Sequence, residues 1–495
     1  MDDVEEVRAM VEQAAERPAP TGAGVRYGTT PLLFGGRFRF GLNRWTYVPF
    51  TVPEGVRRIT VRAAWDRFSI VAGVVGNVLD MGIFGPAGWE VGNRRGFRGW
   101  SGGARSWFTI SDTDATPGYL AGPIEPGTWA VALGPVVLNP LGMRWQIRID
   151  LEYGDSAPEP AEVVSASRAA PDRGPGWYRG DLHLHSVHSD GQRSLDRLAA
   201  EARAAGLDFV VSTEHNTSAA NRAWAARPPA DLLVLAGQEV TTRHGHWLAV
   251  GLPPDGWVDW RYSPRDGVFA DHAGLVRDLG GLVVAAHPAV PMPSVAWGFG
   301  YRDVDAVEVW NGHWNLDDEL ALRIWHRLLC RGRRIPAVGG SDSHAPHQPV
   351  GRPQTEVETG ALTAAEIIEG VRHGRSYLTE SSAVTLRLTA GAGAGVGVGV
   401  GVGVGHTLAV PPEAPVTVTA TVGGAPGTTL SILTAGGRVA RTSIGADGGG
   451  ELRWTTTGAA ARFARAEVRR SGDSRILAPM VALSNPLWLA AADGR

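Results

Sequence analysis

Between residues 177 and 382 the chain alternates short apolar segments with segments of helical periodicity, and this alternation constrains its fold most strongly. FVVST (209–213) and LVVAAH (282–287) are two of the apolar segments, and RSLDRLAAEARAAG (193–206) is one of the expected helices. Strand–helix repetition of this kind is typical of a parallel sheet, either open or closed into a barrel. We therefore expect the middle of the chain to form an α/β domain.

Histidine is concentrated in the same part of the chain. All 14 histidines lie between positions 183 and 406, and all but His406 lie at or before position 373. Histidines used only for core packing would have no reason to stop at a domain boundary. Their distribution therefore indicates a site that depends on histidine chemistry.

Metal-binding residue types recur where the expected strands end. His183 and His185 are two residues apart in DLHLH, so on a strand they share a face and both can reach one ion. Asp342 and His344 have the same spacing in GGSDSH. In parallel barrels the strand ends that precede the following loops are where active sites form. The sequence places a His, Asp or Glu at such strand ends at nine positions: His183, His185, Glu214, His215, Glu239, His246, His287, Asp342 and His344.

The ligand types indicate the class of metal. Imidazole and carboxylate without thiolate favour Zn²⁺, Mn²⁺ or Fe²⁺ over Ca²⁺ and Mg²⁺. One ion needs about four ligands, so the candidates imply two or three ions. A cluster of that size generates hydroxide near neutral pH and stabilises attacking and leaving oxygens, which is what hydrolytic phosphoryl transfer requires.

Five motifs resemble, in their order and approximate spacing, those of the polymerase and histidinol phosphatase (PHP) family. They are DLHLHSVHSDG, STEHN, GQEV, the His287–Pro288 pair and GGSDSH. The resemblance covers residues 177–382 and implies a distorted seven-stranded β/α barrel and a metal-dependent phosphoesterase. EVWNG (308–312), between β-sandwich flanks, resembles the branch of carbaryl-hydrolase-like metallohydrolases, as does GPIEPGTW (122–129) more weakly.

The resemblance also implies how the ligands divide among the ions. The first ion would be held by His183, His185, Glu239 and Asp342. The second would share Glu239 and add His246 and His287. The third would be held by Asp190, His215 and His344. The residues of these three sets are the nine candidate metal ligands that the resemblance implies.

The sequence departs from the family pattern at two positions near the third ion. STEHN (212–216) has Glu-His where the family usually has Asp-His. The ligand His215 is retained, but the resemblance leaves open which groups orient it. Asp190 stands where many relatives have His, so the third ion could be weakened or absent. His188 is an alternative to Asp190, and His244 is an alternative to His246, which we favour because it begins a strand.

The resemblance and the ligand set predict hydrolysis of a small phosphate ester, with nucleotides as favoured substrates, by a metal-bridging hydroxide. Arg352 and the ligand His344 are the candidate catalytic residues, and Arg375 is a reserve for binding the phosphate. Either arginine could instead form a structural salt bridge. Trp310 and Asn311 could stack on and hydrogen-bond to an aromatic base, although Trp310 could equally be rim packing.

Two other functions compete with this prediction. The same ions could polarise the carbonyl of an ester or carbamate, and Trp247, Trp310 and Trp314 would suit an aryl substrate. Alternatively, the barrel could be a non-enzymatic scaffold in a protein that binds glycans or surfaces. A barrel without catalytic function should have lost ligands, and this one keeps every motif.

The flanking segments are predicted to be β-rich. RRITVRAAW (57–65) alternates at period two, and glycine and proline turns separate further strands of the same kind. Seven tryptophans before residue 150 favour core and interface packing over carbohydrate stacking. The predicted divisions are a helical or flexible N-terminus (1–24), a β-sandwich or jelly roll (25–155), a linker (156–176), the barrel (177–382) and an immunoglobulin-like sandwich (383–488) with a Gly/Val-rich surface loop (391–405).

Charge and composition exclude several functions. The net charge is −3, which argues against a nucleic-acid polymer as the partner. The sequence contains no lysine, so Schiff-base chemistry on lysine is excluded. Neither a signal pattern nor a long apolar run is visible, so we expect a cytoplasmic protein that acts on a small molecule away from membranes. The oligomeric state is not predicted.

Overall fold

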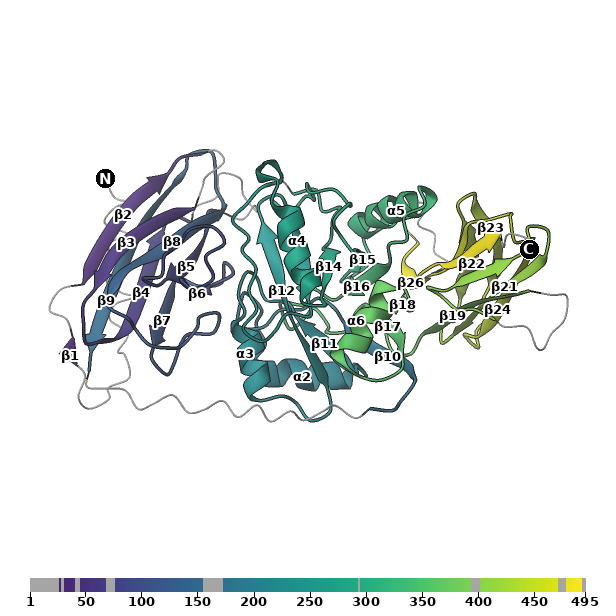
Figure 1. Cartoon of the computed structure of the whole chain (residues 1–495), viewed down its shortest axis with the longest axis horizontal. Coiled ribbons are helices and arrows are strands. Elements are labelled where there is room, and N and C mark those ends of the chain that lie inside the picture. The colour runs from purple at the N-terminus through teal and green to yellow at the C-terminus, as the bar shows by residue number, and fades with distance from the viewer. Residues whose placement is uncertain are drawn as a thin grey trace.

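The computed structural model describes residues 26–27, 31–40, 45–67, 76–154, 172–292, 294–392, 401–470 and 478–491. Figure 1 shows three blocks in a row along the long axis: β-strands at the N-terminal end, a mixed α/β block in the middle and β-strands at the C-terminal end. The predicted N-terminal segment 1–24 and most of the linker 156–176 lie outside the described residues. No helix in the described part of the chain is long and apolar enough to cross a membrane.

The N-terminal block consists of two antiparallel sheets. The first sheet contains β1 (Arg26–Tyr27), β2 (Leu32–Phe38), β4 (Val56–Trp65), β7 (Trp107–Ser111) and β9 (Met143–Tyr153). The second contains β3 (Thr46–Val52), β5 (Val78–Phe84), β6 (Phe97–Trp100) and β8 (Gly127–Val137). Alternate residues of β9 are buried, which is the period-two pattern of a strand with one face on a core. Ile59 and Ile149 are among the fully buried residues of that core.

Aromatic residues of the N-terminal block pack against aromatic residues of the middle block. Trp45 and Trp100 both pack against Trp260, and Phe97 stacks on Trp257 with 4.4 Å between ring centroids. These buried rings form an interface between the two blocks. The packing interpretation of the N-terminal tryptophans is confirmed for Trp45 and Trp100.

The middle block is organised around one mixed sheet. Its strands are β10 (Gly176–Asp181), β11 (Phe209–Ser212), β12 (Leu233–Thr242), β13 (Gly245–Val250), β14 (Leu282–Ala285), β15 (Ala306–Asn311), β16 (Ala337–Gly340), β17 (Gln354–Thr359) and β18 (Ser376–Thr379). The helices are α2 (Leu195–Ala204), α3 (Ala219–Ala226), α4 (Phe269–Asp278), α5 (Leu316–Cys330) and α6 (Ala364–Arg372), with a 3₁₀ turn at Pro264–Asp266. The order across the sheet is β16-β15-β14-β13-β12-β11-β10-β17-β18.

A closed seven-stranded barrel is not confirmed by this sheet. β13 runs antiparallel to both β12 and β14. β10 pairs antiparallel with β17, so it is not an edge strand of the sheet. Within the described residues, an isolated bridge between Leu184 and Ser343 links the extensions of β10 and β16. The Asp342 amide also donates to the His183 carbonyl at 2.7 Å. These contacts bring DLHLH beside GGSDSH, although the two segments are far apart in the sequence.

The C-terminal block continues the same sheet, because β26 pairs with β18. A separate sheet, β19-β21-β24, packs on this extension across a buried apolar core. The strands are β19 (Thr385–Ala392), β20 (Thr407–Val410), β21 (Pro415–Gly423), β22 (Thr428–Thr434), β23 (Gly437–Ser443), β24 (Gly450–Thr457), β25 (Phe463–Arg470), β26 (Met480–Ser484) and β27 (Leu487–Ala491).

The chain segments at the two ends of the glycine–valine run pair with each other. Ala390 and Val402 form an antiparallel bridge, and Val404 is buried. Residues 393–400 lie outside the described residues, so the surface-loop prediction for the middle of the run is not addressed. The ends of the run belong to the sandwich rather than to a surface loop.

Candidate metal centre

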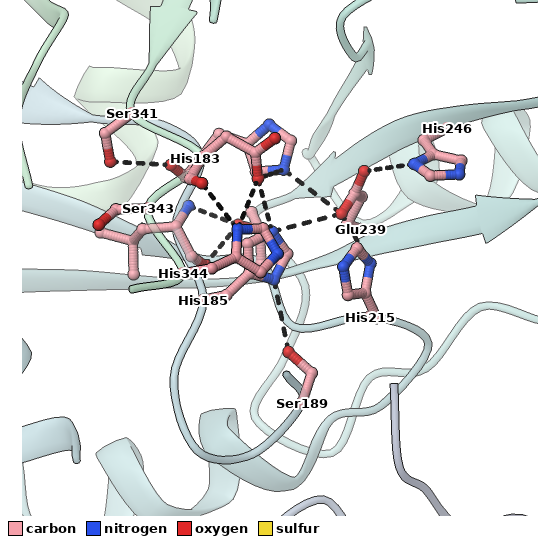
Figure 2. A network of polar contacts seen from close by, with 12 residues as sticks. His183, His185, Ser189, His215, Glu239, His246, Ser341, Ser343 and His344 are labelled. Carbon is pink, nitrogen blue, oxygen red and sulfur yellow. Dashed lines mark hydrogen bonds and ion pairs between the residues drawn. The ribbon is translucent and has the colours of Figure 1, made fainter. Parts of the chain in front are cut away.

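The structure brings all nine candidate ligands into one cluster. Figure 2 shows His183, His185, His215, Glu239, His246 and His344 of this cluster. Among the described residues, four sets of His, Asp or Glu have ligand atoms within 4.8 Å of one another. They are His183–His185–Glu239, Glu239–His246–His287, His185–Asp190–His215–His344 and His183–His287–Glu308. Asp342 joins the cluster through Oδ1, which lies 3.0 Å from Nε2 of His185. Because the members come from separate strands and loops, the fold itself builds the cluster.

Glu239 lies at the centre of the cluster. Its Oε1 lies 2.9 Å from Nδ1 of His246 and 3.1 Å from Nε2 of His287. Its Oε2 lies 3.4 Å from Nε2 of both His183 and His185. Oε2 also lies 2.8 Å from Nδ1 of His215, so the two oxygens of this fully buried carboxylate face different histidines. This geometry suits a carboxylate that bridges two ions.

Asp190, His215 and His344 meet at the outer side of the cluster. Oδ1 of Asp190 lies 3.3 Å from Nε2 of His344 and 3.4 Å from Nε2 of His215. Nδ1 of His344 contacts the Asp342 carbonyl at 2.7 Å, and Nδ1 of His215 contacts Oγ1 of Thr241 at 2.7 Å. These outer contacts turn both Nε2 atoms toward Asp190, as ligands of one ion require.

The two alternative ligands lie outside the cluster. His188 contacts the Ser186 hydroxyl at 3.2 Å, and neither it nor His244 belongs to any of the metal-binding sets among the described residues. The geometry therefore favours Asp190 over His188 and His246 over His244.

Buried atoms without hydrogen-bond partners test whether these residues fit metal ions. Leaving a buried polar atom unpaired costs about 1–3 kcal/mol, so such atoms are rare unless something else satisfies them. Among the described residues, six of them belong to candidate ligands: His183 Nε2, His185 Nε2, Asp190 Oδ1, Glu239 Oε2, His287 Nδ1 and Asp342 Oδ1. A set of nitrogen and oxygen donors facing one another fits divalent transition metals.

The electrostatics of the cluster are dominated by imidazole–carboxylate pairing. Although burial opposes the charged form, Glu239 and Asp190 raise the pKa of His215 to about 10. Burial likewise opposes the charge on His344, but Asp190 and Asp342 raise its pKa to about 9. Ligand imidazoles must be neutral, so cation binding would release protons from these pairs.

His185 behaves in the opposite way. Burial, together with the neighbouring His344 and His215, lowers the pKa of His185 to about 4. Its imidazole is therefore neutral near pH 7, which is the state that binds a metal.

Three residues at the cluster have left-handed backbone conformations, which residues other than glycine rarely adopt. Within the described residues, the non-glycine positions with positive φ are Asn216 (57°), His287 (27°) and Asp342 (46°). Such conformations cost of order 1–3 kcal/mol and persist where the surroundings fix them. Two of these residues are candidate ligands and the third follows His215, so the strain coincides with the site.

Glu308 is a site residue that the motifs did not reveal. Its Oε1 lies 3.0 Å from Nδ1 of His183, and its Oε2 accepts hydrogen bonds from the His287 amide at 2.7 Å and from Nδ2 of Asn311 at 3.1 Å. A carboxylate on Nδ1 directs Nε2 toward the metal. The available signal was a charged residue inside the apolar segment AVEVW, where it is almost fully buried.

Glu214 explains the first departure from the family pattern. Its buried carboxylate accepts hydrogen bonds from the Ser186 amide at 3.1 Å and from the Ser189 hydroxyl at 2.5 Å. It also pairs with the Ser186 hydroxyl. Glu214 therefore supports the loop that leads to Asp190, rather than contributing to a set of ligands.

A cavity of about 950 Å³ opens beside the ligands. Its lining includes Asp342 and His344, together with Arg470 and Met480 of the C-terminal block. Arg352 also lines it, and Nε of Arg352 donates to the Glu380 carbonyl at 3.3 Å. The cavity therefore joins the candidate metal centre to a wall formed by both blocks.

The predicted substrate residues differ in their placement. Trp310 and Asn311 line the large cavity, but Trp310 is only 2% exposed and its Nε1 donates to the Gly312 carbonyl. Its burial favours the packing interpretation over base stacking.

Two residues lie elsewhere than the sequence predicted. Arg375 lines a separate cavity of about 450 Å³ beside Glu358, so it does not serve as a reserve for Arg352. Trp247 is fully buried, and its Nε1 donates to the Tyr262 hydroxyl, so it is a core residue and not a residue of the mouth. Position along the chain suggested both placements, but the direction of each side chain depends on the assembled fold.

One family model matches part of the region that contains the motifs. The model of the PHP-associated family matches residues 327–376, a range that contains Asp342, His344 and Arg352. No curated protein matches the chain. Among solved structures, a two-domain protein containing a predicted PHP-like metal-dependent phosphoesterase from Bacteroides vulgatus is 17% identical. That match covers 64% of this chain and 98% of the other, with a TM-score of 0.36.

A second solved structure is an amidohydrolase from Chromobacterium violaceum with bound sulfate and no metal. It is 20% identical, and the match covers 40% of this chain and 96% of the other, with a TM-score of 0.28. The fold and the ligand cluster define a multi-domain protein with a candidate metal centre at the strand ends of its middle block. The five motifs and the match at residues 327–376 together support a PHP family protein.

Proposed function

We propose that the chain is a metal-dependent hydrolase of small phosphate esters, with nucleotides as the favoured substrates and two or three Mn²⁺, Zn²⁺ or Fe²⁺ ions as cofactors. The observation that carries the proposal is the convergence of nine imidazole and carboxylate ligands around Glu239 beside a large cavity. Divalent ions bound there would activate water and stabilise charge on the attacking and leaving oxygens. The bridge between Leu184 and Ser343 also supports the proposed arrangement of β10 to β16 as the barrel of the family.

Residues of the chain would position the substrate in this cavity. Arg352 lies on the cavity wall, and a guanidinium group can bind two phosphate oxygens at once. Asn311 lies between Glu308 and Asp342, with its Nδ2 3.1 Å and 3.3 Å from their carboxylates. Its amide therefore helps to hold the inner wall of the site. A volume of about 950 Å³ exceeds what a phosphate group needs and suits a nucleotide-sized molecule.

Hydrolysis of an aryl ester or carbamate is the second candidate. The cavity wall carries Trp314, Pro349, Pro353, Pro479 and Met480, which are apolar groups that could accept an aryl ring. The same candidate ions would then polarise a carbonyl group in place of a phosphoryl group.

A substrate panel separates the two candidates. Phosphomonoesters, phosphodiesters and aryl esters would be assayed with Mn²⁺, with Zn²⁺ and with chelator, and His185→Ala would serve as the inactive control. The proposal predicts metal-dependent turnover of phosphate esters that is lost with chelator and in His185→Ala. Turnover of aryl esters alone would favour the second candidate, and turnover that persists in chelator would contradict both.

A further inference from the structure

The N-terminal sandwich touches the loop that carries Asp190. The contact comes from residues 101–105, which follow β6, and Gly102 has a φ of +64°. A Cβ atom at Gly102 would lie 2.7 Å from Cβ of Ser189 and 3.4 Å from Cβ of His215. The two backbones therefore approach more closely than any side chain at this position allows.

A second set of contacts fixes the neighbouring residues. A Cβ atom at Gly118 would lie 2.6 Å from the His188 carbonyl oxygen. The Gly118 carbonyl accepts a hydrogen bond from the Thr217 hydroxyl at 2.8 Å, and the Arg105 guanidinium donates to the Val187 carbonyl. The sandwich thus contacts the chain on both sides of the third-ion candidates.

The contacting loop is itself firmly held within the sandwich. The buried carboxylate of Asp80 accepts hydrogen bonds from the Ser101 hydroxyl at 2.5 Å and from the Met81 amide at 2.8 Å. The Ser101 amide donates to the Met81 carbonyl at 2.9 Å. Because the aromatic interface around Trp260 also docks the sandwich, Gly102 has a fixed position relative to the middle block.

Several ligands assigned to the first two ions are supported by the central sheet itself. Glu239 lies within β12 and His246 within β13, and the segment that carries His183 is bridged to the segment after β16. Asp190 instead lies in a loop that begins at Ser186, outside any strand. The position of Asp190 therefore depends on what packs against that loop.

We propose that the N-terminal sandwich is a positioning element for the third ion. Its loop 101–105 and Gly118 hold Asp190 and His215 at the spacing that this ion needs, whereas the first two ions depend on the central sheet. This inference rests on the proposed metal centre. It gives the N-terminal sandwich a role in the site, although none of its described residues belongs to a candidate ligand set.

The test is the metal content of Gly102→Ala protein. The added methyl group must displace the backbone of the 186–190 loop, and changes in the residues that orient ligands typically weaken metal binding by roughly 10–100-fold. We expect the affinity for one ion per chain to fall by this factor while the other ions are retained. Elemental analysis after equilibration at graded Mn²⁺ concentrations would measure the change. Thermal unfolding would report whether the variant is folded.

Gly103→Ala is the matched control. Gly103 is the next residue in the same loop and has a similar φ of +81°, but the nearest atom to its Cβ position is Cγ1 of Val78 at 4.0 Å. The backbone strain is therefore comparable, and the clash with the central domain is missing. Equal ion loss in both variants, or none in Gly102→Ala, would overturn the proposal.

Arg105→Ala provides a second variant that introduces no clash. It should also weaken the third ion, and Arg105→Lys should restore part of the binding because lysine can still donate to the Val187 carbonyl. If Gly102→Ala does not fold, this pair decides the question, and unchanged ion content in Arg105→Ala would refute the inference. A wild-type protein that binds no ion would refute the metal centre itself, whereas unchanged stoichiometry in the variants refutes only the role of the sandwich.

Discussion

Glu308 shows how one buried carboxylate can organise a metal site without being among its nine expected ligands. Its two oxygens contact the ring of His183 and the backbone of His287, so it orients two ligands that were predicted to bind different ions. His287 also has a left-handed φ of 27°, and the hydrogen bond from its amide helps to hold that conformation.

Glu308→Gln should weaken metal binding by roughly 10–100-fold, because the amide is a poorer partner for Nδ1 of His183. Competition with a chromophoric chelator would measure the change. Glu413→Gln, an exposed carboxylate in the C-terminal block, should leave metal affinity as in the wild type. Unaltered affinity in Glu308→Gln would show that the carboxylate does not orient the ligand.

Arg352→Ala should lower kcat/KM for a phosphate ester by roughly 10²–10³-fold, the size expected when a group that stabilises transition-state charge is removed. Hydrolysis of a neutral aryl carbamate, if present, should be spared. Arg375→Ala should leave both reactions unaffected, because Arg375 lines a different cavity. Equal losses on both substrates in Arg352→Ala would contradict a phosphate-binding role.

At the scale of elements, the sequence predicted which residues gather at the site better than it predicted the sheet that carries them. Alternation along DLHLH placed His183 and His185 on one face because side-chain direction on a strand is a local property. Whether β13 runs parallel or antiparallel to β12 depends on the tight connection between Thr242 and Gly245, and on pairing partners far away in the sequence. Glu308 was missed for the same reason, since its partners come from other strands.

The contact between α5 and β25 is an element-scale feature with a defined pH dependence. Glu467 accepts hydrogen bonds from Arg465 at 2.6 Å and Arg469 at 2.7 Å, and Arg469 also pairs with Glu319 on α5. Although burial opposes its charge, these arginines lower the pKa of Glu467 from 4.5 to about 2. The stabilisation is therefore complete above pH 4.5 and is lost as the pH falls toward 2.

Glu467→Gln should destabilise the protein by about 3–5 kcal/mol near neutral pH, because it leaves the buried Arg465 without its carboxylate and leaves Arg469 with Glu319 alone. The difference in Tm between wild type and variant should narrow as the pH falls below about 4.5, since the wild-type carboxylate is then increasingly protonated. Glu451→Gln, which breaks a pair with Arg453 at the surface, should change Tm little at any pH. A pH-independent difference for Glu467→Gln would exclude the proposed charge network.

At the scale of the whole molecule, the sequence predicted β-rich flanks but not what they do. The N-terminal sandwich approaches the site through Gly102 and Gly118, and a glycine carries no side chain whose type could reveal a partner. The C-terminal block joins the central sheet through β26, and it places Arg470 and Met480 in the cavity wall. Such contacts between distant segments follow from the assembled fold and leave little trace in local sequence patterns.

The proposed function depends on the candidate ligands holding metal ions. The most direct measurement is elemental analysis of full-length protein purified without chelators, with His185→Ala prepared in parallel. We predict two or three transition-metal ions per chain in the wild type and a lower content in the variant. A wild-type protein that carries no transition metal, and takes up none from Mn²⁺ or Zn²⁺ solutions, would contradict the proposed function.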